Sequence, residues 1–362
     1  MLNILHLDTG MEMRGGQWQI LSLAEGLRSR SHRQVLACPQ GSLLFDRARV
    51  SGLDIFALPG SGAWNGRSIA LLRRLIGERA FQIVHAHDGR GQTLAWEASV
   101  GLPVKRVASR RVAFLSNRLL HCLKYSLTCH GIIAVSAFVR ELLVASGVPA
   151  EKIAVIPDGV EIPETVASSA ERACLRSRWQ AGQQDFLVGH IGAFTAEKGQ
   201  DVAVGAVELL AGTFPRLTLL LAGDGPRRQM LQRQCAARGV RSVRFVGYVR
   251  DLDSFFNCLD VFAMPSRTEG LGSSALMAMA HGLPVVASQT GGLAEIVEHE
   301  RTGWLVQPGS PTALAEAIAH ACAAGERLVT MGQAAREKAR SFSSDILTAK
   351  TEAFYDQLLK IT

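Results

Sequence analysis

The chain has 362 residues, 48% of them hydrophobic and 20% charged, which is the balance of a globular protein with about two domains. No stretch approaches the roughly 20 apolar residues of a membrane-spanning helix, so any membrane contact is expected to be peripheral. The formal net charge is +7, and residues 1–162 carry all of it, with 19 Lys and Arg against 12 Asp and Glu. Two explanations stay open: an anionic partner, such as a membrane surface or charged lipid, or solubility alone. Nucleic acid is not expected as a partner.

Short apolar runs alternate with stretches of helical periodicity in the first half of the chain, and this alternation predicts a parallel sheet covered by helices. The opening run, MLNILHLDTG, is typical of a first strand and not of a signal peptide. Helices are predicted at Ile69–Glu78 and Ala137–Ala145, and a polar linker at Asp158–Ala170. Strands are predicted at Leu2–Leu7, Gln34–Cys38, Asp54–Leu58, Ile83–Ala86, Val104–Ala108, Gly131–Val135 and Ile153–Ile156.

The same alternation restarts in the second half. Helices are predicted at Gln200–Ala211 and Gly272–His281, and the chain after Thr312 is predicted to be wholly helical, through Phe342–Lys360. Strands are predicted at Phe186–Ile191, Leu217–Ala222, Val243–Phe245, Val261–Met264 and Val285–Ala287. The fold class is therefore α/β, with two doubly wound, Rossmann-like domains that bind ligands at the carboxyl ends of their strands.

Two motifs of the first half point to a site. Gly15 and Gly16 precede a helix, where backbone N–H groups can meet a phosphate, although a tight turn explains the pair equally well. His85 and His87 share one face at the end of a strand; we interpret His87 as functional and His85 as a hydrogen-bonded structural residue. A metal site there stays open, but no third ligand has suitable spacing.

Charged residues and glycines follow two strands of the second half. Lys198 lies between Gly192 and Gly199, where its ammonium can meet a diphosphate. Glu269 precedes Gly270, Leu271, Gly272 and Ser273, where a helix opens and offers free N–H groups to an anion, and Glu269 itself can accept hydrogen bonds from sugar hydroxyls. Asp251 and Asp253 resemble a metal-binding DxD motif, but capping of a short helix explains them better.

These motifs resemble the family 4 glycosyltransferases, which are retaining enzymes of the GT-B fold, here of the bacterial cell-envelope polysaccharide and lipopolysaccharide type. The resemblance covers essentially the whole chain and is carried by RGGQ at 14–17, VHAHD at 84–88, IAVSAFVRELL at 133–143, VIPDGVE at 155–161, GAFTAEKGQD at 192–201, LAGDGP at 221–226, FVGY at 245–248 and DVFAMPSRTEGLGSSALMAMAHGLPVVASQTGG at 260–292. It implies an acceptor-binding domain at 1–162, a nucleotide-sugar-binding domain at 163–341, a cleft between them and a helix at 342–362 that returns to the first domain.

The resemblance also implies roles for residues. His87, Lys198 and Glu269 are expected to be catalytic: His87 near the transferred sugar, Lys198 on the diphosphate and Glu269 on sugar hydroxyls. Substrate contacts are expected from Gly15, Gly16, Arg110, Arg111, Tyr248, Val249, Gly270, Leu271, Gly272 and Ser273. Two positions depart from the family. Ala193 stands where an Arg usually assists the Lys, and Met277 stands where a second acidic residue usually holds the ribose.

The expected reaction is transfer of a sugar from a nucleotide-diphosphate sugar to a glycan or lipid-linked acceptor, with retention and without a metal or other cofactor. UDP is expected only from the habit of the family. Seven scattered cysteines without a CxxC pair favour a reducing compartment, so the expected location is the cytoplasm, at most peripheral on the inner membrane face. Two alternatives remain: a sugar-nucleotide epimerase on the same scaffold, or a catalytically degenerate transferase that acts as a binding protein because of Ala193 and Met277.

Overall fold

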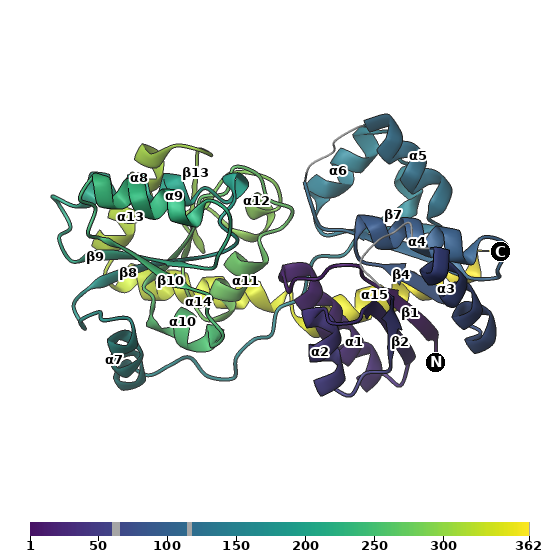
Figure 1. The fold of residues 1–362 in the computed structure, drawn as a ribbon. Coiled ribbons are helices and arrows are strands. Elements are labelled where there is room, and N and C mark those ends of the chain that lie inside the picture. The colour runs from purple at the N-terminus through teal and green to yellow at the C-terminus, as the bar shows by residue number, and fades with distance from the viewer. Residues whose placement is uncertain (60–65, 114–117, 362) are drawn as a thin grey trace. The chain divides into compact units, whose positions relative to one another are not determined.

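The computed structural model describes residues 1–59, 66–113 and 118–361, with the side chains of 118–121 left aside. The chain forms two compact units, Met1–Gly159 with Ser344–Thr362, and Val160–Ser343 (Figure 1). They are called the first unit and the second unit below. Each contains one parallel sheet with helices packed against it, so the described chain consists of two Rossmann-like α/β units.

The first unit holds a parallel seven-stranded sheet. Its strands are β1 (Asn3–Leu7), β2 (Arg33–Pro39), β3 (Ile55–Leu58), β4 (Ile83–Ala86), β5 (Lys105–Arg110), β6 (Gly131–Ala134) and β7 (Ile153–Val155). Its helices are α1 (Gly15–Ser29), α2 (Leu43–Val50), α3 (Gly66–Arg79), α4 (Gly89–Ser99), α5 (Arg118–Thr128), α6 (Ala137–Ala145), the 3-10 turn η1 (Ala150–Lys152) and α15 (Ser344–Lys360).

The second unit holds a parallel six-stranded sheet. Its strands are β8 (Phe186–Ile191), β9 (Leu217–Ala222), β10 (Val243–Gly247), β11 (Val261–Met264), β12 (Val285–Ser288) and β13 (Gly303–Val306). Its helices are α7 (Ser169–Arg178), the 3-10 turn η2 (Ala196–Lys198), α8 (Gln200–Leu210), α9 (Arg228–Ala237), α10 (Leu252–Cys258), α11 (Ser273–Ala280), α12 (Leu293–Ile296), α13 (Pro311–Ala323) and α14 (Glu326–Arg340).

The two sheets share one topology. The strand order is β3-β2-β1-β4-β5-β6-β7 in the first and β10-β9-β8-β11-β12-β13 in the second. In both, the direction of the strand order reverses between the unit's first strand and its fourth. Loops diverge above the carboxyl ends of the strands at this switch point and leave room for a ligand. The switch points therefore lie between β1 and β4 and between β8 and β11.

Buried apolar strands explain why the sheets form. Every residue of β4, β6, β9, β11 and β12 is buried, as expected for parallel strands that are covered on both faces. Polar residues at helix starts then fix where the helices begin. Asp88 caps α4 by accepting hydrogen bonds from the backbone N–H groups of Arg90 and Gly91, and Asp251 caps α10 through Ser254 N–H. Asp251 is thus engaged in capping, as the sequence indicates.

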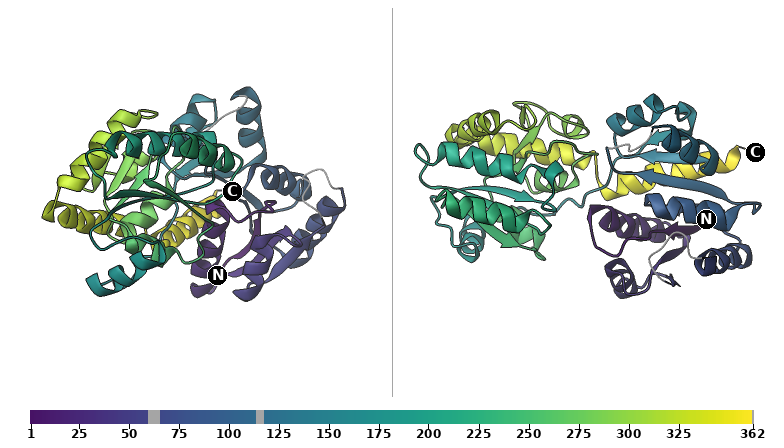
Figure 2. Two further views of the ribbon diagram at one scale, coloured as in Figure 1. Left: turned by 60° about the vertical axis from the view of Figure 1, so that its left-hand side comes forward. Right: turned by 45° about the horizontal axis from the view of Figure 1, so that its top comes forward.

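Helix α15 completes the core of the first unit. Its Phe354, Tyr355 and Leu358 are buried among the apolar residues of β1, α1, β4, β5 and β6. A hydrogen bond of 2.9 Å joins Ser344 Oγ to Ser22 Oγ of α1, and Glu352 pairs with His32 at 2.8 Å. Figure 2 shows this helix, in yellow, lying along the first sheet.

Most predicted strands lie within a residue or two of the observed bounds. β13 is the exception, since no strand was predicted at Gly303–Val306. Its run of four residues, GWLV, holds only three apolar residues and lies between the polar segments 299–302 and 307–310, so it resembles part of a loop in sequence. It pairs with β12 in parallel and forms the edge of the second sheet.

Candidate functional site

Lys198 and Glu269 lie together at the switch point of the second unit. Lys198 ends the turn η2 after β8, and Glu269 follows β11, the neighbouring strand. The Lys198 ammonium is 2.7 Å from Glu269 Oε2, and the two side chains are 24% and 13% exposed. Ser266 Oγ donates a second hydrogen bond to the same oxygen, at 3.2 Å. Two predicted catalytic residues, 71 positions apart, thus form one partly buried ion pair.

Contacts between the loops hold this pair in place. Arg267 donates from both terminal nitrogens to the carboxylate of Asp201, at 2.9 and 2.7 Å, and its backbone N–H donates to Glu197 O at 2.7 Å. A planar guanidinium suits such a two-point pairing. The segment after β11 is therefore tied to the segment after β8 beside the Lys198–Glu269 pair.

Glycine is required where these loops touch. Gly199 has a φ of +68°, and a Cβ there would lie 2.0 Å from Pro265 O. Gly291 has a φ of +53°, and a Cβ there would lie 1.9 Å from Glu269 O. A side chain at either position would clash with backbone that carries the site, because real Cβ contacts are never this short. These glycines let the loops after β8, β11 and β12 approach one another closely.

The start of α11 offers an anion site beside Glu269. Gly272 precedes the helix with a φ of +98° and provides no side-chain cap, and Ser273 begins the helix, half-buried. The first N–H groups of a helix have no partner within the helix and carry partial positive charge. Leu271 is 2% exposed and Gly270 is also buried, so this segment presents backbone and not side chains.

The other predicted residues of this unit lie as follows. Ala193 is half-buried, and its carbonyl accepts a hydrogen bond of 2.9 Å from Gln200 Nε2. Met277 is half-buried on α11, although its neighbours Leu276 and Ala278 are fully buried, so it does not belong to the core face of the helix. Tyr248 is 63% exposed and Val249 is half-buried, both just after β10.

In the first unit, His87, Arg111 and Gly16 come together at the switch point between β1 and β4. Arg111 Nη1 lies 3.5 Å from His87 Nδ1, and Arg111 Nε donates to Asp158 Oδ1 at 3.0 Å. A Cβ on Gly16 would lie 3.7 Å from Arg111 Cδ, so this glycine is in contact with the arginine, and Gly15 begins the same helix, α1. Three predicted residues are thus neighbours. Arg110 is buried, with Nε donating to Val112 O and Nη1 at 3.5 Å from Tyr125 Oη.

Two carboxylates lie beside this group. Asp8 follows β1 and is 1% exposed; burial and then the charge of Asp88 raise the pKa of Asp8 to about 6. Gln17 Nε2 donates to Asp8 at 3.1 Å, and Gly10 N–H donates to it at 3.0 Å. Asp88 accepts from Thr9 Oγ1 at 3.1 Å. Sequence reasoning missed Asp8, although a carboxylate directly after the first strand was a signal that could have found it.

Three buried histidines, one of them His87, lie close together in the first unit. The potential ligand nitrogens of His6, His85 and His87 lie within 4.8 Å of one another, so a third residue does reach the pair that spacing alone left without one. Both ring nitrogens of His85 are already bonded, Nδ1 to Tyr355 Oη at 2.6 Å and Nε2 to Ser109 Oγ at 2.8 Å. A metal bound by all three rings would have to break bonds of this kind close to the Arg111 cation. The arrangement fits a hydrogen-bond network, and His85 has the structural role that we expected.

Burial keeps this network uncharged. Loss of solvent lowers the pKa of His6 to about 4, and it lowers the pKa of His87 well below its usual range, with the charges of His85, Arg111 and His6 adding to the effect. Neutral imidazoles each have one donor and one acceptor nitrogen. The chemistry of this side of the molecule is thus hydrogen bonding by neutral rings next to one cation, Arg111.

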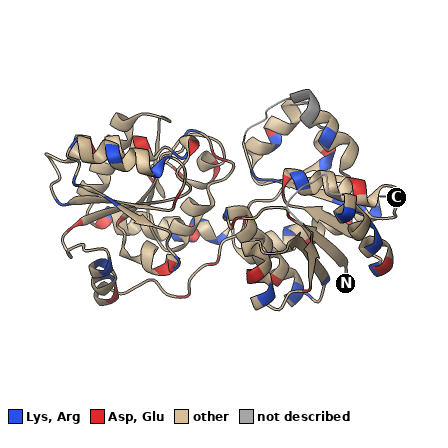
Figure 3. Ribbon diagram, in the orientation of Figure 1, with Lys and Arg blue, Asp and Glu red and all other residues tan. Residues whose placement is uncertain are grey.

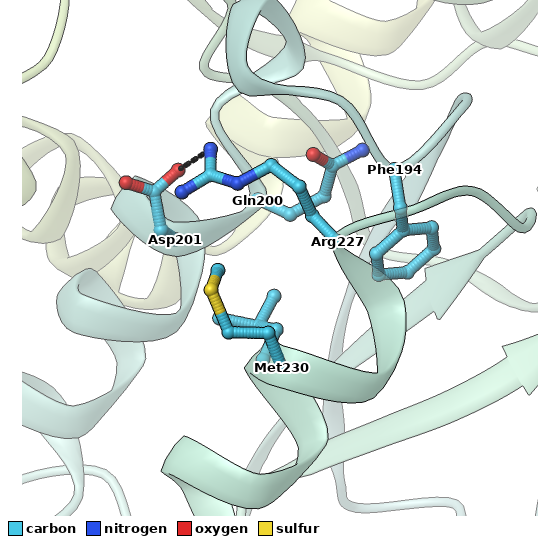
Figure 4. Close-up of a pocket in the computed structure, with 6 residues that line it drawn as sticks. Phe194, Gln200, Asp201, Arg227 and Met230 are labelled. Carbon is cyan, nitrogen blue, oxygen red and sulfur yellow. Dashed lines mark ion pairs between the residues drawn. The ribbon is translucent and has the colours of Figure 1, made fainter.

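A small pocket of the second unit is lined by Phe194, Gln200, Asp201, Arg227, Met230 and Leu231 (Figure 4). Its cavity volume is about 10 Å³, which is room for about one water molecule. Arg227 and Asp201 pair across it at 3.6 Å. This pocket is too small for a sugar or a nucleotide.

Two doubly wound sheets with polar groups at both switch points are the architecture of α/β enzymes that bind nucleotides there. Comparison with family models defines the chain further. Residues 172–338 match the model described as "Glycosyl transferases group 1", and residues 13–163 match "Glycosyltransferase Family 4". The chain belongs to the glycosyltransferases, with a family 4 domain in its first unit and a group 1 domain in its second.

Curated relatives are glycosyltransferases as well. A GDP-mannose-dependent alpha-(1-6)-phosphatidylinositol monomannoside mannosyltransferase of Mycobacterium tuberculosis is 29% identical over 90% of this chain and 90% of its own length. The 2-deoxystreptamine glucosyltransferase of Streptomyces kanamyceticus is 34% identical over 52% of this chain and 50% of its own length.

Solved structures share the fold. Anabaena Alr3699/HepE, in complex with UDP and glucose, has a TM-score of 0.89 at 22% identity and covers 98% of this chain and 100% of its own. The apo form of the lipopolysaccharide outer core galactosyltransferase WaaB has a TM-score of 0.72 at 14% identity, over 99% and 100%. These likenesses establish that the fold is that of GT-B enzymes.

Proposed function

We propose that this glycosyltransferase moves a hexosyl group from a nucleoside-diphosphate sugar to a glycan or lipid-linked acceptor, with retention of anomeric configuration. The observation that carries the proposal is the Lys198–Glu269 pair beside the uncapped start of α11. A cation, a carboxylate and a row of free N–H groups are what a sugar diphosphate needs: positive groups for the phosphates and an acceptor for sugar hydroxyls.

The donor chemistry follows from these groups. Breakage of the sugar–phosphate bond develops negative charge on the departing diphosphate, and preorganised cations and N–H groups stabilise that charge where it forms. Lys198 and the N–H groups of Gly272 and Ser273 take this role, while Glu269 exchanges its bond to Lys198 for sugar hydroxyls. Because protein groups supply the positive charge, we propose that no metal or other cofactor is required.

The nucleotide is proposed to be UDP, with GDP as the direct competitor. Complexes with UDP of a protein of the same fold favour UDP, and the GDP-mannose-dependent relative, at 29% identity, favours GDP. Tyr248 and Val249 flank the base in this proposal. Met277 leaves the ribose without a carboxylate partner, so the choice of base depends on other groups.

In the first unit, His87 is proposed to lie near the transferred sugar, Gly16 and Arg111 are proposed to contact substrate, and the unit as a whole is proposed to bind the acceptor and to dock on an anionic membrane surface. From Ala98 to Arg140 the chain has seven Lys and Arg and no acidic residue. Figure 3 marks the basic residues of the first unit in blue. Within the part of the chain that the structure describes, no helix is both long and apolar enough to cross a bilayer. The proposed location is the cytoplasm, at the inner membrane face.

The decisive experiment incubates the purified protein with UDP-glucose, UDP-galactose, UDP-N-acetylglucosamine and GDP-mannose, each with and without a bacterial lipid extract. We expect one donor to release its nucleoside diphosphate only when lipid is present, with a glycosylated lipid in the mass spectrum and undiminished activity in EDTA. Interconversion of sugar nucleotides without lipid would establish an epimerase. Absence of both nucleotide binding and turnover would establish a degenerate binding protein, and loss of activity in EDTA would overturn the metal-free mechanism.

A further inference from the structure

A histidine and an aspartate join two helices of the second unit. His281 caps the carboxyl end of α11, and Asp253 lies in the first turn of α10. His281 Nε2 lies 2.9 Å from Asp253 Oδ1, and His281 Nδ1 lies 2.8 Å from Met277 O. Asp251 caps α10, so the two aspartates of the sequence motif have different roles. Neither His281 nor Asp253 takes part in the proposed reaction.

The two hydrogen-bond partners of His281 determine how many protons its ring carries. A backbone carbonyl can only accept a hydrogen bond, and an ionised carboxylate can only accept as well. Both ring nitrogens must therefore donate. A neutral imidazole has one N–H and an imidazolium has two, so the ring that makes both bonds is a cation. A neutral ring would direct a lone pair at one of the two oxygens.

The surroundings of the ring favour this charge although the ring is buried. The His281 side chain is 5% exposed, and burial by itself disfavours a charged ring. The Asp253 carboxylate supplies the opposite charge, and the carboxyl end of α11 carries a partial negative charge. The ring of Phe256 lies 5.0 Å from the imidazole, centroid to centroid, and an aromatic face attracts a cation. From α14, which packs against α11, Arg336 bonds to two backbone carbonyls and not to the ring.

We infer that His281 is a positively charged positioning residue that fastens α10 to α11. Helix α10 follows directly on the turn that contains Tyr248 and Val249, and α11 begins at the anion site after Gly272. The pair of His281 and Asp253 therefore fixes the turn after β10 relative to the helix that meets the diphosphate. This consequence for nucleotide binding rests on the proposed function, whereas the charge of His281 and its bond to Asp253 do not.

The charge of His281 can be measured directly. Nitrogen NMR of protein labelled at the histidine rings reports the protonation of each ring nitrogen, and His281→Gln identifies the His281 signals among those of 10 histidines. We expect both ring nitrogens of His281 to be protonated at neutral pH. In Asp253→Asn the amide can donate to Nε2, so a neutral ring keeps both bonds, and Nε2 should have lost its proton. A neutral His281 in the wild-type protein would overturn the inference, whatever the activity.

Two variants at Asp253 separate the hydrogen bond from the charge. Asp253→Ala removes both, so amide hydrogen exchange in α10 should become about fivefold faster, as for loss of one partly exposed ion pair. Asp253→Asn removes the charge and keeps the bond, so its exchange should stay close to that of the wild type. Glu337→Ala is the matched control, because Glu337 is another exposed carboxylate of the second unit, paired with Arg340 at 3.4 Å.

Kinetics with the identified sugar donor test the consequence for the nucleotide. In Asp253→Ala, the KM for the donor should rise by about fivefold while kcat stays near the wild-type value, because separate contacts hold Lys198 and Glu269. Asp253→Asn should have a KM close to that of the wild type. An unchanged KM in Asp253→Ala would overturn the role of the pair in nucleotide positioning.

The outcomes separate the inference from the proposed function. A charged ring in the wild type, a neutral ring in Asp253→Asn and faster exchange in Asp253→Ala alone support the inference. Equal acceleration of exchange in both Asp253 variants overturns the fastening by His281. The spectra and the exchange rates are measured without a ligand, so a wild-type protein that gives the expected results and transfers no sugar from any donor would contradict the proposed function alone.

Discussion

The two units share a strand order but use the switch point differently. In each, the penultimate residue of the first strand is a buried histidine, His6 in β1 and His190 in β8. His6 passes its hydrogen bond to another side chain, His87, whereas His190 bonds to Ala263 O at 2.9 Å and to Gln200 Nε2 at 3.2 Å. His6 thus bonds to a ring on the neighbouring strand, and His190 bonds to backbone and to a glutamine beneath a loop.

The two switch points also differ in charge. In the second unit, the side chains near the switch point are charged and the surrounding loops are rich in glycine, which suits a charged ligand that approaches the backbone. In the first unit, neutral rings lie beside one cation that is already paired with Asp158. The same topology therefore carries charged side chains and glycine-rich loops at one switch point and neutral rings at the other, and the change depends on a few residues at strand ends.

The largest effect is expected from the charged pair of the second unit. Lys198→Ala removes the cation beside the diphosphate and should lower the rate by about 10²–10³-fold, as for loss of one key electrostatic group. Initial rates with the identified donor measure this. Arg301→Ala, which removes an exposed cation paired with Glu298 in the same unit, is the control and should change the rate little. Near-normal turnover by Lys198→Ala would remove the residue from the mechanism.

Acid should destabilise both units through the two equivalent histidines. Burial lowers the pKa of His6 and of His190 to about 4, below the value of about 6.5 in an unfolded chain. The unfolded state therefore binds more protons between pH 6.5 and 4, and the free energy of unfolding falls as the pH is lowered through that range. Each histidine accounts for about 3 kcal/mol, at 1.36 kcal/mol per unit of pKa.

Protonation of Asp8 changes the free energy of unfolding in the opposite direction. Its pKa is raised to about 6, so its protonation in the folded state makes folding more favourable as the pH falls from about 6 to 4. Urea titrations at a series of pH values should show that the free energy of unfolding falls less on acidification in His190→Gln than in the wild type. The contributions of His6 and Asp8 to this pH dependence should be unchanged in the variant. If the free energy of unfolding depended on pH in that variant as it does in the wild type, the neutral state of His190 would be contradicted.

A third expected effect concerns the ribose. Met277→Glu adds a carboxylate at a half-buried position of α11, and charged hydrogen bonds to ribose hydroxyls are worth about 1.5–3 kcal/mol, so nucleotide binding should tighten by roughly tenfold or more. Calorimetric titration of the nucleoside diphosphate measures the gain, with a melting curve on the same samples. Met230→Glu, on α9 of the same unit and 40% exposed, controls for added charge. Equal or weaker affinity with a lower melting temperature would show that position 277 only packs.

The smallest expected effect is on membrane binding, which should depend on the basic first unit and not on the second. Each basic residue near an anionic membrane is worth about 1 kcal/mol, so Lys105→Ser should weaken co-sedimentation with anionic vesicles about fivefold, and salt should weaken it further. Arg301→Ser, in the second unit, should have no such effect. Binding that is indifferent to lipid charge and to salt would leave solubility as the explanation of the excess charge. Lys105 and Lys124 are described, whereas the side chain of Arg118 in the same basic run lies outside the described residues.

The fold could be predicted because parallel strands are buried on both faces and therefore appear as apolar runs such as Leu217–Ala222. The second site could be predicted in large part because Glu269, Gly270 and Gly272 are adjacent in sequence. The pairing of Glu269 with Lys198 depends on the adjacency of β8 and β11, which the sequence does not display. The network of the first unit was missed for the same reason: Gln34 is 28 residues from His6, and His87 is 81 residues from it. Only the order of β2, β1 and β4 brings them together.

Helix α15 has a consequence for how the protein is made. Ribosomes release a chain from its beginning, and domains usually fold in that order. Here the first unit lacks Phe354, Tyr355 and Leu358, and with them the covering of its core, until the whole of the second unit has been synthesised. The second unit, Val160–Ser343, has all its strands earlier. Translation therefore exposes an incomplete first sheet for the whole time in which the second is produced, and the unit that begins the sequence is the last to close.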